Sequence, residues 1–174
     1  AWITGASSGI GEAVALELAQ RGWTVAITAR RLDQLEEIAR RADGLPGRIV
    51  AHAGDVTDPG AMKAVIEAIE NVHGPIALAF LNAGIASGQG KAVDVETVEA
   101  VVGVNLLGVA KSFFAIQPRM VARGAGQIAV NASLVGYAGM PGSGAYGASK
   151  AAAIHLCESL RFECDRLGIR LQLV

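Results

Sequence analysis

The stretch TGASSGIG, residues 4–11, follows a short apolar run of β type and opens a segment of helical period. Glycine allows a tight turn and the close approach of a ligand, and the amide groups of a helix N-terminus attract anions. The stretch therefore predicts a diphosphate-binding turn. Alone it is a weak signal, because any tight strand-to-helix turn can use glycine and the spacing is not GxGxxG. The candidate cofactor-binding residues here are Gly5, Ser7, Ser8, Gly9, Ile10 and Gly11.

Outward from this stretch, short β-rich apolar runs alternate with segments of helical period. This alternation is typical of a parallel sheet with crossover helices, so we expect an α/β fold with a doubly wound parallel sheet. Asp58 followed by Pro59 predicts the N-cap and first residue of a helix. The predicted strands span residues 1–4, 24–29, 48–53, 76–81, 127–131 and 169–174; the helix markers are Ile10, Val14 and Leu18, then Leu32, Leu35 and Ile38, then Met62, Val65, Ile66 and Ile69.

Composition limits the class of protein. The 174 residues suit one ordinary domain, and a hydrophobic share of 52% against 18% charged residues favours a buried sheet. The formal net charge is -1 and Lys and Arg form no block, so we expect no nucleic-acid partner. The longest apolar run, residues 76–81, is far shorter than the roughly 20 residues of a membrane helix, and no leader precedes Thr4. We therefore expect a cytoplasmic protein without a membrane partner.

The cysteines and histidines predict no metal site. Cys157 and Cys164 lie seven positions apart, which suits neither a disulfide scaffold nor a zinc site, and we interpret both as core residues. His52, His73 and His155 lack metal-ligand spacing and are interpreted as structural or surface residues.

Residues 106–121 form a predicted helix whose apolar side chains cover more than one face. Such a helix is buried on two sides. We expect one side to contact the sheet and the other a partner subunit, alongside Ala151 and Ile154 of the next helix. The apolar residues are Leu106, Leu107, Val109, Phe113, Phe114, Ile116 and Met120.

Arg30 and Arg31 follow the second predicted strand, about 20 residues beyond the glycine stretch. A fold that binds NAD usually has a carboxylate there, for the ribose 2′-hydroxyl. A guanidinium can instead bind a 2′-phosphate through paired hydrogen bonds, so this chain is predicted to prefer NADP. The competing interpretation is a solvated helix start.

Two further strand ends offer cofactor contacts. Asp55 follows the third strand, where its carboxylate can accept from an adenine amino group while the Val56 amide donates to the ring. Because Asp58 explains the nearby helix cap, Asp55 is expected to be free, although a turn role competes. Asn82, Ala83 and Gly84 follow the fourth strand at the edge where α/β sheets bind ligands, and without other motifs they would be interpreted as a turn.

The sequence YGASK places Tyr146 and Lys150 one helical turn apart on one face of a predicted helix. A phenol ordinarily titrates near pH 10, so it needs a nearby cation to exchange protons at neutral pH. Lys150 can supply that charge, and Tyr146 can then act as a general acid or base. The pair alone would be interpreted as two ordinary surface residues.

Context changes that interpretation. Ser133 lies at the end of the fifth predicted strand, thirteen residues before Tyr146, where it can orient a carbonyl group. Asn105, at the start of the apolar helix, can bend that helix and hold a water, and a helix cap is the alternative.

Taken together, TGASSGIG, NAG at residues 82–84, VNLLG around Asn105, Ser133 and YGASK resemble the motifs of the short-chain dehydrogenase/reductase family, over essentially the whole chain. The resemblance implies a Rossmann-like NAD(P)-dependent oxidoreductase with Asn105, Ser133, Tyr146 and Lys150 as catalytic tetrad. It also implies a proton relay through a water held by Asn105, a cofactor contact from Lys150 and Tyr146, and a dimer or tetramer.

The chain departs from the family pattern at both ends. Family members usually have several residues before the glycine loop, and a substrate-covering segment and a seventh strand after the sixth. We therefore expect about six strands, near-complete cofactor contacts and an open substrate pocket. The leading interpretation is hydride transfer between NADPH and a ketone or aldehyde. An NAD-dependent alcohol dehydrogenase and a non-catalytic nucleotide-binding protein are the alternatives.

Overall fold

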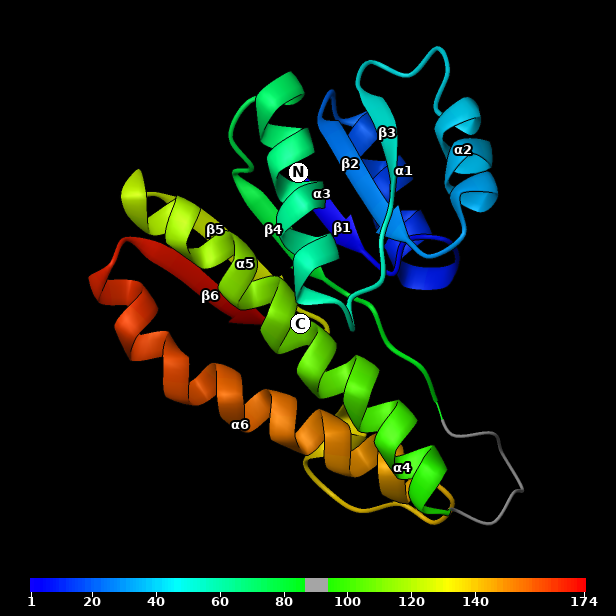
Figure 1. Cartoon of the computed structure of the whole chain (residues 1–174), viewed down its shortest axis with the longest axis vertical. Helices are drawn as coiled ribbons and strands as arrows, with labels where there is room; N and C mark the ends of the chain where they lie inside the picture. The colour runs from blue at the N-terminus through cyan, green and yellow to red at the C-terminus, as the bar shows by residue number, and fades with distance from the viewer. Residues whose placement is uncertain (87–93) are drawn as a thin grey trace.

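A computed structural model of the chain describes residues 1–86 and 94–174. Within these residues six strands form one parallel sheet in the order β3-β2-β1-β4-β5-β6 (Figure 1). The prediction of a doubly wound parallel sheet is confirmed. The fourth strand begins two residues later than predicted. The strands are β1 (Trp2–Thr4), β2 (Thr24–Ala29), β3 (Arg48–Ala53), β4 (Leu78–Leu81), β5 (Gly126–Val130) and β6 (Ile169–Leu173).

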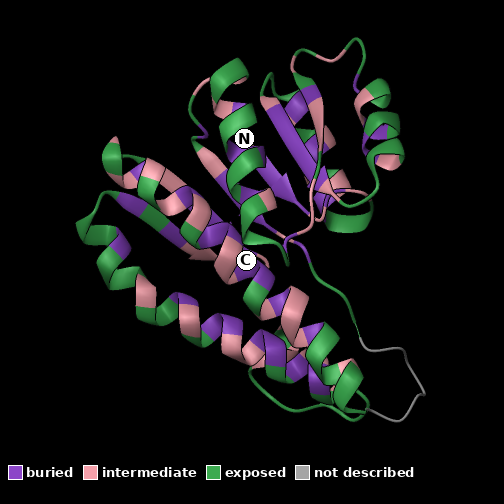
Figure 2. Ribbon diagram, in the orientation of Figure 1, coloured by how far each residue is buried: buried purple, intermediate pink, exposed green. Residues whose placement is uncertain are grey.

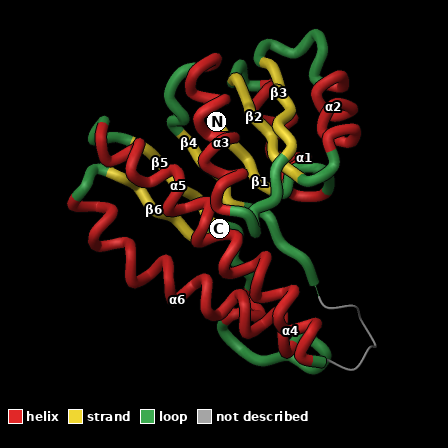
Figure 3. Tube along the Cα trace, in the orientation of Figure 1, coloured by secondary structure: helices red, strands yellow, loops and turns green. Residues whose placement is uncertain are grey.

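Helices connect successive strands and cover both faces of the sheet (Figure 3). The side chain of Asp58 accepts from the amides of Gly60 (2.7 Å) and Ala61 (3.2 Å), so the predicted N-cap is confirmed. The helical segments are α1 (Gly9–Gln20), α2 (Leu32–Arg41), α3 (Pro59–His73), α4 (Val95–Val102), the π-helical turn η1 (Gly103–Gly108), α5 (Val109–Ala122), the 3₁₀ turn η2 (Leu134–Gly136) and α6 (Gly144–Arg166).

The strands separate two layers of core, because successive side chains of a strand point to opposite faces. Trp2 of β1 belongs to the core layer that includes residues of α3, α5 and α6, whereas its neighbour Ile3 belongs to the layer that includes residues of α1 and α2. In Figure 2 the central strands and the inner sides of the helices are buried and the outer sides are exposed. Burial of each large apolar side chain contributes roughly 1.5–3 kcal/mol, which makes the sheet a firm support for the loops at its carboxyl edge.

Helix α1 packs through small residues rather than through its predicted stripe. The residues it buries are Gly11, Ala15 and Ala19, each one position beyond a predicted marker. Ile10, the first marker, is 57% exposed. The small side chains let α1 lie close to the sheet immediately after the tight glycine turn.

The predicted helix 106–121 is the second half of a longer helical stretch, Val95–Ala122, which includes α4, η1 and α5. By length and hydropathy this stretch could cross a membrane, but Phe113, Ile116 and Met120 are buried in the core beside α3. Its other side is partly exposed, with Phe114 at 50%. Ile154 is buried within the chain at 5% exposure, so the expectation that it helps to form a subunit contact is wrong.

The two cysteines of the chain are free, and both are buried in the core, as predicted. Burial raises the pKa of the Cys157 thiol to about 11, so this thiol stays protonated and unreactive at neutral pH.

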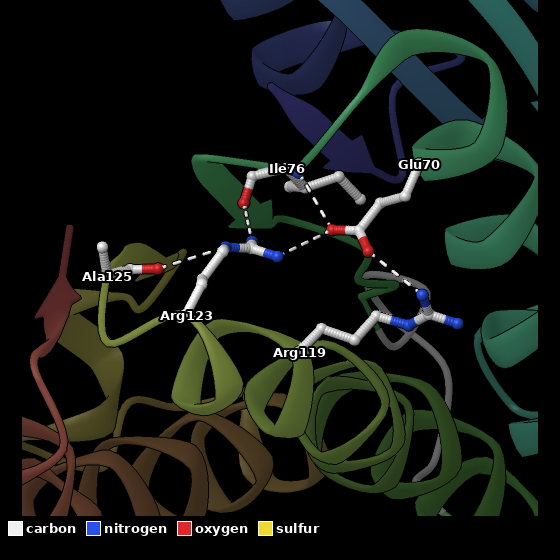
Figure 4. A network of polar contacts seen from close by, with 5 residues as sticks. All are labelled: Glu70, Ile76, Arg119, Arg123 and Ala125. Atoms are coloured by element: carbon white, nitrogen blue, oxygen red, sulfur yellow. Dashed lines mark hydrogen bonds and ion pairs between the residues drawn. The ribbon is translucent and has the colours of Figure 1, made fainter.

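An ionic network fastens α3 and α5 at the amino edge of the sheet (Figure 4). The Glu70 carboxylate accepts from the Ile76 amide (3.0 Å) and from the guanidinium groups of Arg119 (3.1 Å) and Arg123 (3.0 Å). Arg123 also donates to the carbonyls of Ile76 and Ala125. Burial by itself would raise the pKa of Glu70, but these donors outweigh it and lower the pKa overall. The Ile76 amide is used here rather than in the strand ladder, which accounts for the later start of β4.

Candidate active site

The turn between β1 and α1 depends on two glycines in the left-handed region. Gly5 has φ +65° and Gly9 has φ +62°. A Cβ on Gly5 would lie 2.5 Å from the Ala83 Cα, closer than any side chain tolerates. The Gly5 amide also donates to the Thr28 carbonyl of β2 (2.8 Å). Only glycine at position 5 allows the turn to lie against both the segment after β4 and the end of β2.

The N-terminus of α1 points its free amide groups out of this turn. Ser8 is the N-cap residue, and no side chain of the described residues caps the helix start. Ser8, Gly9 and Ile10 are exposed. Uncapped amides together with the positive end of the helix dipole favour an anionic group, and this is what a diphosphate needs.

Asn82 holds the turn between β1 and α1 through hydrogen bonds. Its Nδ2 donates to the carbonyls of Gly5 (3.0 Å) and Thr4 (3.3 Å), and its backbone amide donates to the Thr4 Oγ1 (3.1 Å). The missing side chain of Gly11 leaves room for this amide, because a Cβ there would lie 2.6 Å from Nδ2. Thr4 was not among the predicted site residues, and a threonine at the end of a buried strand was the signal that could have found it.

A cleft of about 590 Å³ opens along the carboxyl edge of the sheet. Most predicted cofactor residues line it, whereas Gly9, Ile10, Gly11, Asn82, Tyr146 and Lys150 do not. The predicted residues in its lining are Gly5, Ser7, Ser8, Arg30, Arg31, Asp55, Val56, Ala83 and Gly84; it also includes Thr28, Ala29, Gly54, Thr57, Ile85, Glu99, Ala100, Gly103 and Val104, which sequence reasoning did not single out.

Asp55 is not free, contrary to expectation. Its Oδ1 accepts from the amide and the hydroxyl of Thr57, both at 2.8 Å. The Thr57 amide is the main cause that lowers the pKa of Asp55; burial opposes it, and the Thr57 hydroxyl and the charges of Arg30 and Lys111 add to the lowering. Asp55 therefore remains an acceptor in the cleft while it also holds the turn after β3.

Asn105 lies inside the continuous helical stretch, in the π turn η1, and not at a helix start, so the helix-cap alternative is wrong. It is fully buried. Its Oδ1 accepts from the Ile85 amide (2.8 Å), and its Nδ2 donates to the Ile85 carbonyl (2.9 Å) and to the Ser149 Oγ (3.0 Å). The Ser149 hydroxyl in turn donates to the Tyr146 carbonyl (2.7 Å). Asn105 thus joins the chain after β4 to the start of α6, through a serine that sequence reasoning missed.

Tyr146 and Lys150 occupy the first two turns of α6. The Lys150 side chain is 3% exposed, and its Nζ lies 5.7 Å from the centre of the half-buried Tyr146 ring. The Nζ donates to the Asn131 carbonyl at the end of β5 (2.6 Å). Burial lowers the pKa of Lys150. The structure therefore places an ammonium group beside the tyrosine, as the sequence predicted.

Ser133 precedes the turn η2, and its Oγ accepts weakly from the Val135 amide (3.4 Å). This turn packs closely on α6, since a Cβ on Gly136 would lie 3.1 Å from the Lys150 backbone carbon. Ser133 and Tyr146 are therefore carried by two elements in direct contact.

The predicted catalytic residues do not belong to the cleft lining. Gly84 and Ile85 form the link, because both line the cleft and both contact Asn105: a Cβ on Gly84 would lie 3.4 Å from its Oδ1. An uncapped helix start, a basic pair and this neighbouring Tyr-Lys pair together fit a dinucleotide whose reactive ring would lie toward α6.

Comparison with known proteins identifies the family and supports the fold. The sequence profile of the short chain dehydrogenase family matches residues 1–174. An uncharacterized oxidoreductase of Listeria innocua is 34% identical over 171 residues, which cover 98% of this chain and 69% of that protein. A short-chain type dehydrogenase/reductase from Mycobacterium marinum superimposes with a TM-score of 0.93 at 32% identity, over 99% of this chain and 71% of that one.

Solved neighbours differ in cofactor. A metagenomic short-chain oxidoreductase in complex with NADP is 30% identical, with a TM-score of 0.91 and coverage of 99% of this chain and 79% of that one. An NAD⁺-bound xylitol dehydrogenase is 27% identical, with a TM-score of 0.93 and coverage of 99% and 67%. Neighbours with this fold thus include both an NADP complex and an NAD⁺ complex. From its family match, its parallel sheet and this cleft, the chain belongs to the short-chain dehydrogenase/reductase family of oxidoreductases.

Proposed function

We propose that the protein reduces a ketone or aldehyde with NADPH, and that Tyr146 is the general acid. One observation carries the proposal: the buried ammonium of Lys150 lies 5.7 Å from the Tyr146 ring, next to a cleft that begins at an uncapped helix start. A positive charge in this position stabilises a phenolate, so the phenol can release its proton to a developing alkoxide. In the reverse direction the phenolate takes the proton of an alcohol.

The remaining residues have distinct roles in this proposal. The nicotinamide supplies or accepts the hydride. Ser133 orients the carbonyl oxygen toward Tyr146, and Lys150 replenishes its proton and holds the nicotinamide ribose. Asn105 connects segment 82–86 with α6 through Ile85 and Ser149, and a water held at Asn105 is the proposed relay that links Lys150 to solvent. Gly5, Ser7 and Ser8 would hold the diphosphate, and Asp55 and Val56 the adenine.

The test is turnover of the full-length protein with NADPH and a panel of neutral ketones and aldehydes. Tyr146→Phe should lower kcat by at least about 100-fold, the lower end of what a positioned acid contributes. Tyr137→Phe is the matched control, because the other tyrosine of the chain is 68% exposed on the neighbouring turn. If Tyr146→Phe keeps the wild-type rate, the assignment of the acid is wrong. If the wild type reduces no carbonyl substrate, the result favours the alternative of a non-catalytic nucleotide-binding protein.

The choice of NADPH rests on Arg30 and Arg31, which both line the cleft at the end of β2. A charge-assisted pair with a 2′-phosphate contributes about 1.5–3 kcal/mol, so Arg30→Ala should raise the Kd for NADPH by roughly 10- to 100-fold and leave that for NADH unchanged. Arg21→Ala, which removes an exposed arginine outside the cleft, is the control. Equal use of NADH and NADPH by the wild type would favour the NAD-dependent alcohol dehydrogenase instead.

We also propose a homodimer or homotetramer formed through the exposed side of η1 and α5. Leu107 (48% exposed) and Phe114 (50%) lie seven residues apart and so share one helix face. Light scattering at micromolar concentration should give a multiple of the chain mass, and Phe114→Glu should lower it. A monomeric wild type would refute this proposal.

The proposed compartment is the cytoplasm. Both cysteines are free and buried, as suits a reducing environment. Fractionation of cells that express the full-length protein tests this, and recovery from the membrane or secreted fraction would contradict it.

A further inference from the structure

Three asparagine and lysine contacts connect the glycine turn with α6. Asn82 donates from Nδ2 to the Gly5 carbonyl (3.0 Å), and its Oδ1 accepts from the Asn131 Nδ2 (2.8 Å). The backbone carbonyl of the same Asn131 accepts from the Lys150 Nζ (2.6 Å). The connection crosses β1, β4 and β5 just beyond their carboxyl ends. Asn131 is the residue of this connection that the sequence did not single out.

The orientation of each amide in this connection is fixed. The nitrogen of Asn82 must face the carbonyls of Gly5 and Thr4, because an oxygen there would meet two acceptors. The oxygen of Asn82 therefore faces Asn131 and requires a donor. The Asn131 Nδ2 supplies that donor at 2.8 Å. Its orientation follows from the network and not from a choice between equivalent rotamers.

The same residue provides the hydrogen-bond acceptor of a buried cation. Lys150 is 3% exposed, and its ammonium has the Asn131 carbonyl as hydrogen-bond acceptor. A buried ammonium is costly unless an acceptor is fixed in place beside it. Tyr146 is the titratable group that the structure describes next to it, and burial is the cause that lowers the pKa of Lys150. The Asn131 carbonyl thus fixes the place of the ammonium beside Tyr146.

We propose that Asn131 is a positioning residue for Lys150: its side chain, held by Asn82, fixes the backbone carbonyl that holds the ammonium beside Tyr146. The proposal rests on the proposed function, in which Lys150 serves the tyrosine. Because Asn82 also donates to the Gly5 carbonyl, Asn131 connects the position of the phosphate-binding turn with the position of Lys150 and Tyr146. The peptide N–H of Asn131 donates to the Leu81 carbonyl (3.1 Å), so the sheet holds one side of this peptide and the side chain the other.

The test removes the side-chain donor and measures the lysine itself. Asn131→Ala deletes the amide, and Asn131→Leu deletes it while filling nearly the same space, so one of the two remains informative if the other does not fold. Gln127→Ala is the matched control, because Gln127 lies on the same strand and pairs through its amide with Gln172, at the far end from the site. The full-length protein is labelled with ¹³Cε-lysine; the four lysines of the given sequence keep the spectrum simple, and Lys150→Met assigns the signal.

Two readouts are expected to move together. Loss of a fixed acceptor disfavours the ammonium, so the titration midpoint of Lys150 should fall by about one pH unit in Asn131→Ala and Asn131→Leu. The phenolate then loses support, so the alkaline midpoint of alcohol oxidation should rise by about one unit and turnover at neutral pH should fall about tenfold. Gln127→Ala should change neither midpoint.

A merely structural role gives a different result. If both Asn131 variants lose thermal stability but keep the wild-type Lys150 midpoint and pH profile, the proposal is overturned; unchanged stability with unchanged midpoints overturns it as well. The lysine titration needs no turnover, so it is independent of the proposed function. That function fails separately, through wild-type activity in Tyr146→Phe.

Discussion

Replacement of Gly5 by alanine tests how closely the phosphate-binding turn must lie against the segment after β4. At position 5 an alanine meets two problems, a positive φ of +65° and a backbone contact of 2.5 Å between its Cβ and the Ala83 Cα. At Gly9 the φ is nearly the same, +62°, but nothing lies within 4 Å of a Cβ. Gly9→Ala therefore measures the cost of the backbone conformation alone, and the difference between the two variants measures the close approach.

The magnitudes follow from this geometry. A left-handed alanine costs about 1–2 kcal/mol, and the lower entropy of its unfolded chain returns about 0.4–1 kcal/mol, so Gly9→Ala should lower the free energy of unfolding by roughly 1 kcal/mol. Gly5→Ala must in addition move backbone atoms apart by about 1 Å, which resembles overpacking of a core at about 1–3 kcal/mol. We expect a total of about 3 kcal/mol, or a fall in Tm of roughly 6–12 °C.

Urea denaturation followed by circular dichroism measures the free energy of unfolding, and titration of intrinsic fluorescence measures the Kd for NADPH. Because Ala83 lines the cleft, the shift forced by Gly5→Ala should also weaken NADPH binding by about tenfold or more, as expected for a lost interaction of about 1.4 kcal/mol. Gly22→Ala, at φ +86° with open space and outside the cleft, controls for strain without any effect on binding. The reasoning is refuted if Gly5→Ala is no more destabilising than Gly9→Ala.

Three further predictions concern the surroundings of the site. Glu70→Gln should lower the free energy of unfolding by about 1–3 kcal/mol at neutral pH, measured by urea denaturation. Because the folded-state pKa of Glu70 is lowered, the stabilisation by its carboxylate is present above the unfolded value of about 4.3 and is lost as the pH falls through the folded pKa. The difference between Glu70→Gln and the wild type should therefore vanish in acid, and a difference that does not change with pH would contradict the ionic role. Asp58→Ala should lower the free energy of unfolding by about 1 kcal/mol through loss of the α3 cap, whereas Asp58→Asn should be nearly neutral in the same experiment. Lys111→Met removes the hydrogen bond from Nζ to the carbonyl of Thr57 (2.6 Å), which lines the cleft. The variant should raise the Kd for NADPH by about 3- to 10-fold and leave kcat unchanged. A lower kcat at the same Kd would show that the position of Thr57 does not depend on this contact.

Much of the fold was predictable because its signals are local. The alternation of short apolar runs with helical segments located β2 and β3 to the residue, and Asp58 with Pro59 located the start of α3. These signals act between neighbours in the chain, where spacing alone specifies which side chains share a face. The buried stripe of α1 was misplaced by one residue, since its packing is decided by the short distance to the sheet and not by hydrophobicity.

The part of the site that was missed depends on contacts between distant residues. The roles of Asn105 and Ser149 follow from hydrogen bonds that span 20 and 44 positions, and the π turn that points Asn105 inward has no local signal in VNLLG. Asp55 was expected to be free because the cap at Asp58 had already been assigned. The structure shows that the two neighbouring acids hold two successive turns.

The sequence by itself determined the elements of this protein and the chemical groups at their ends: glycines at the first turn, arginines after β2, a tyrosine and a lysine on one face of α6. The tertiary structure decided which of these groups meet. Strand order places β1, β4 and β5 side by side, and only then can Asn82 hold the Gly5 carbonyl and Asn131, and Asn131 the ammonium of Lys150. The physical reason is that spacing along a chain fixes the direction of a side chain within its own element, whereas its partner is fixed by the packing of elements far apart in sequence.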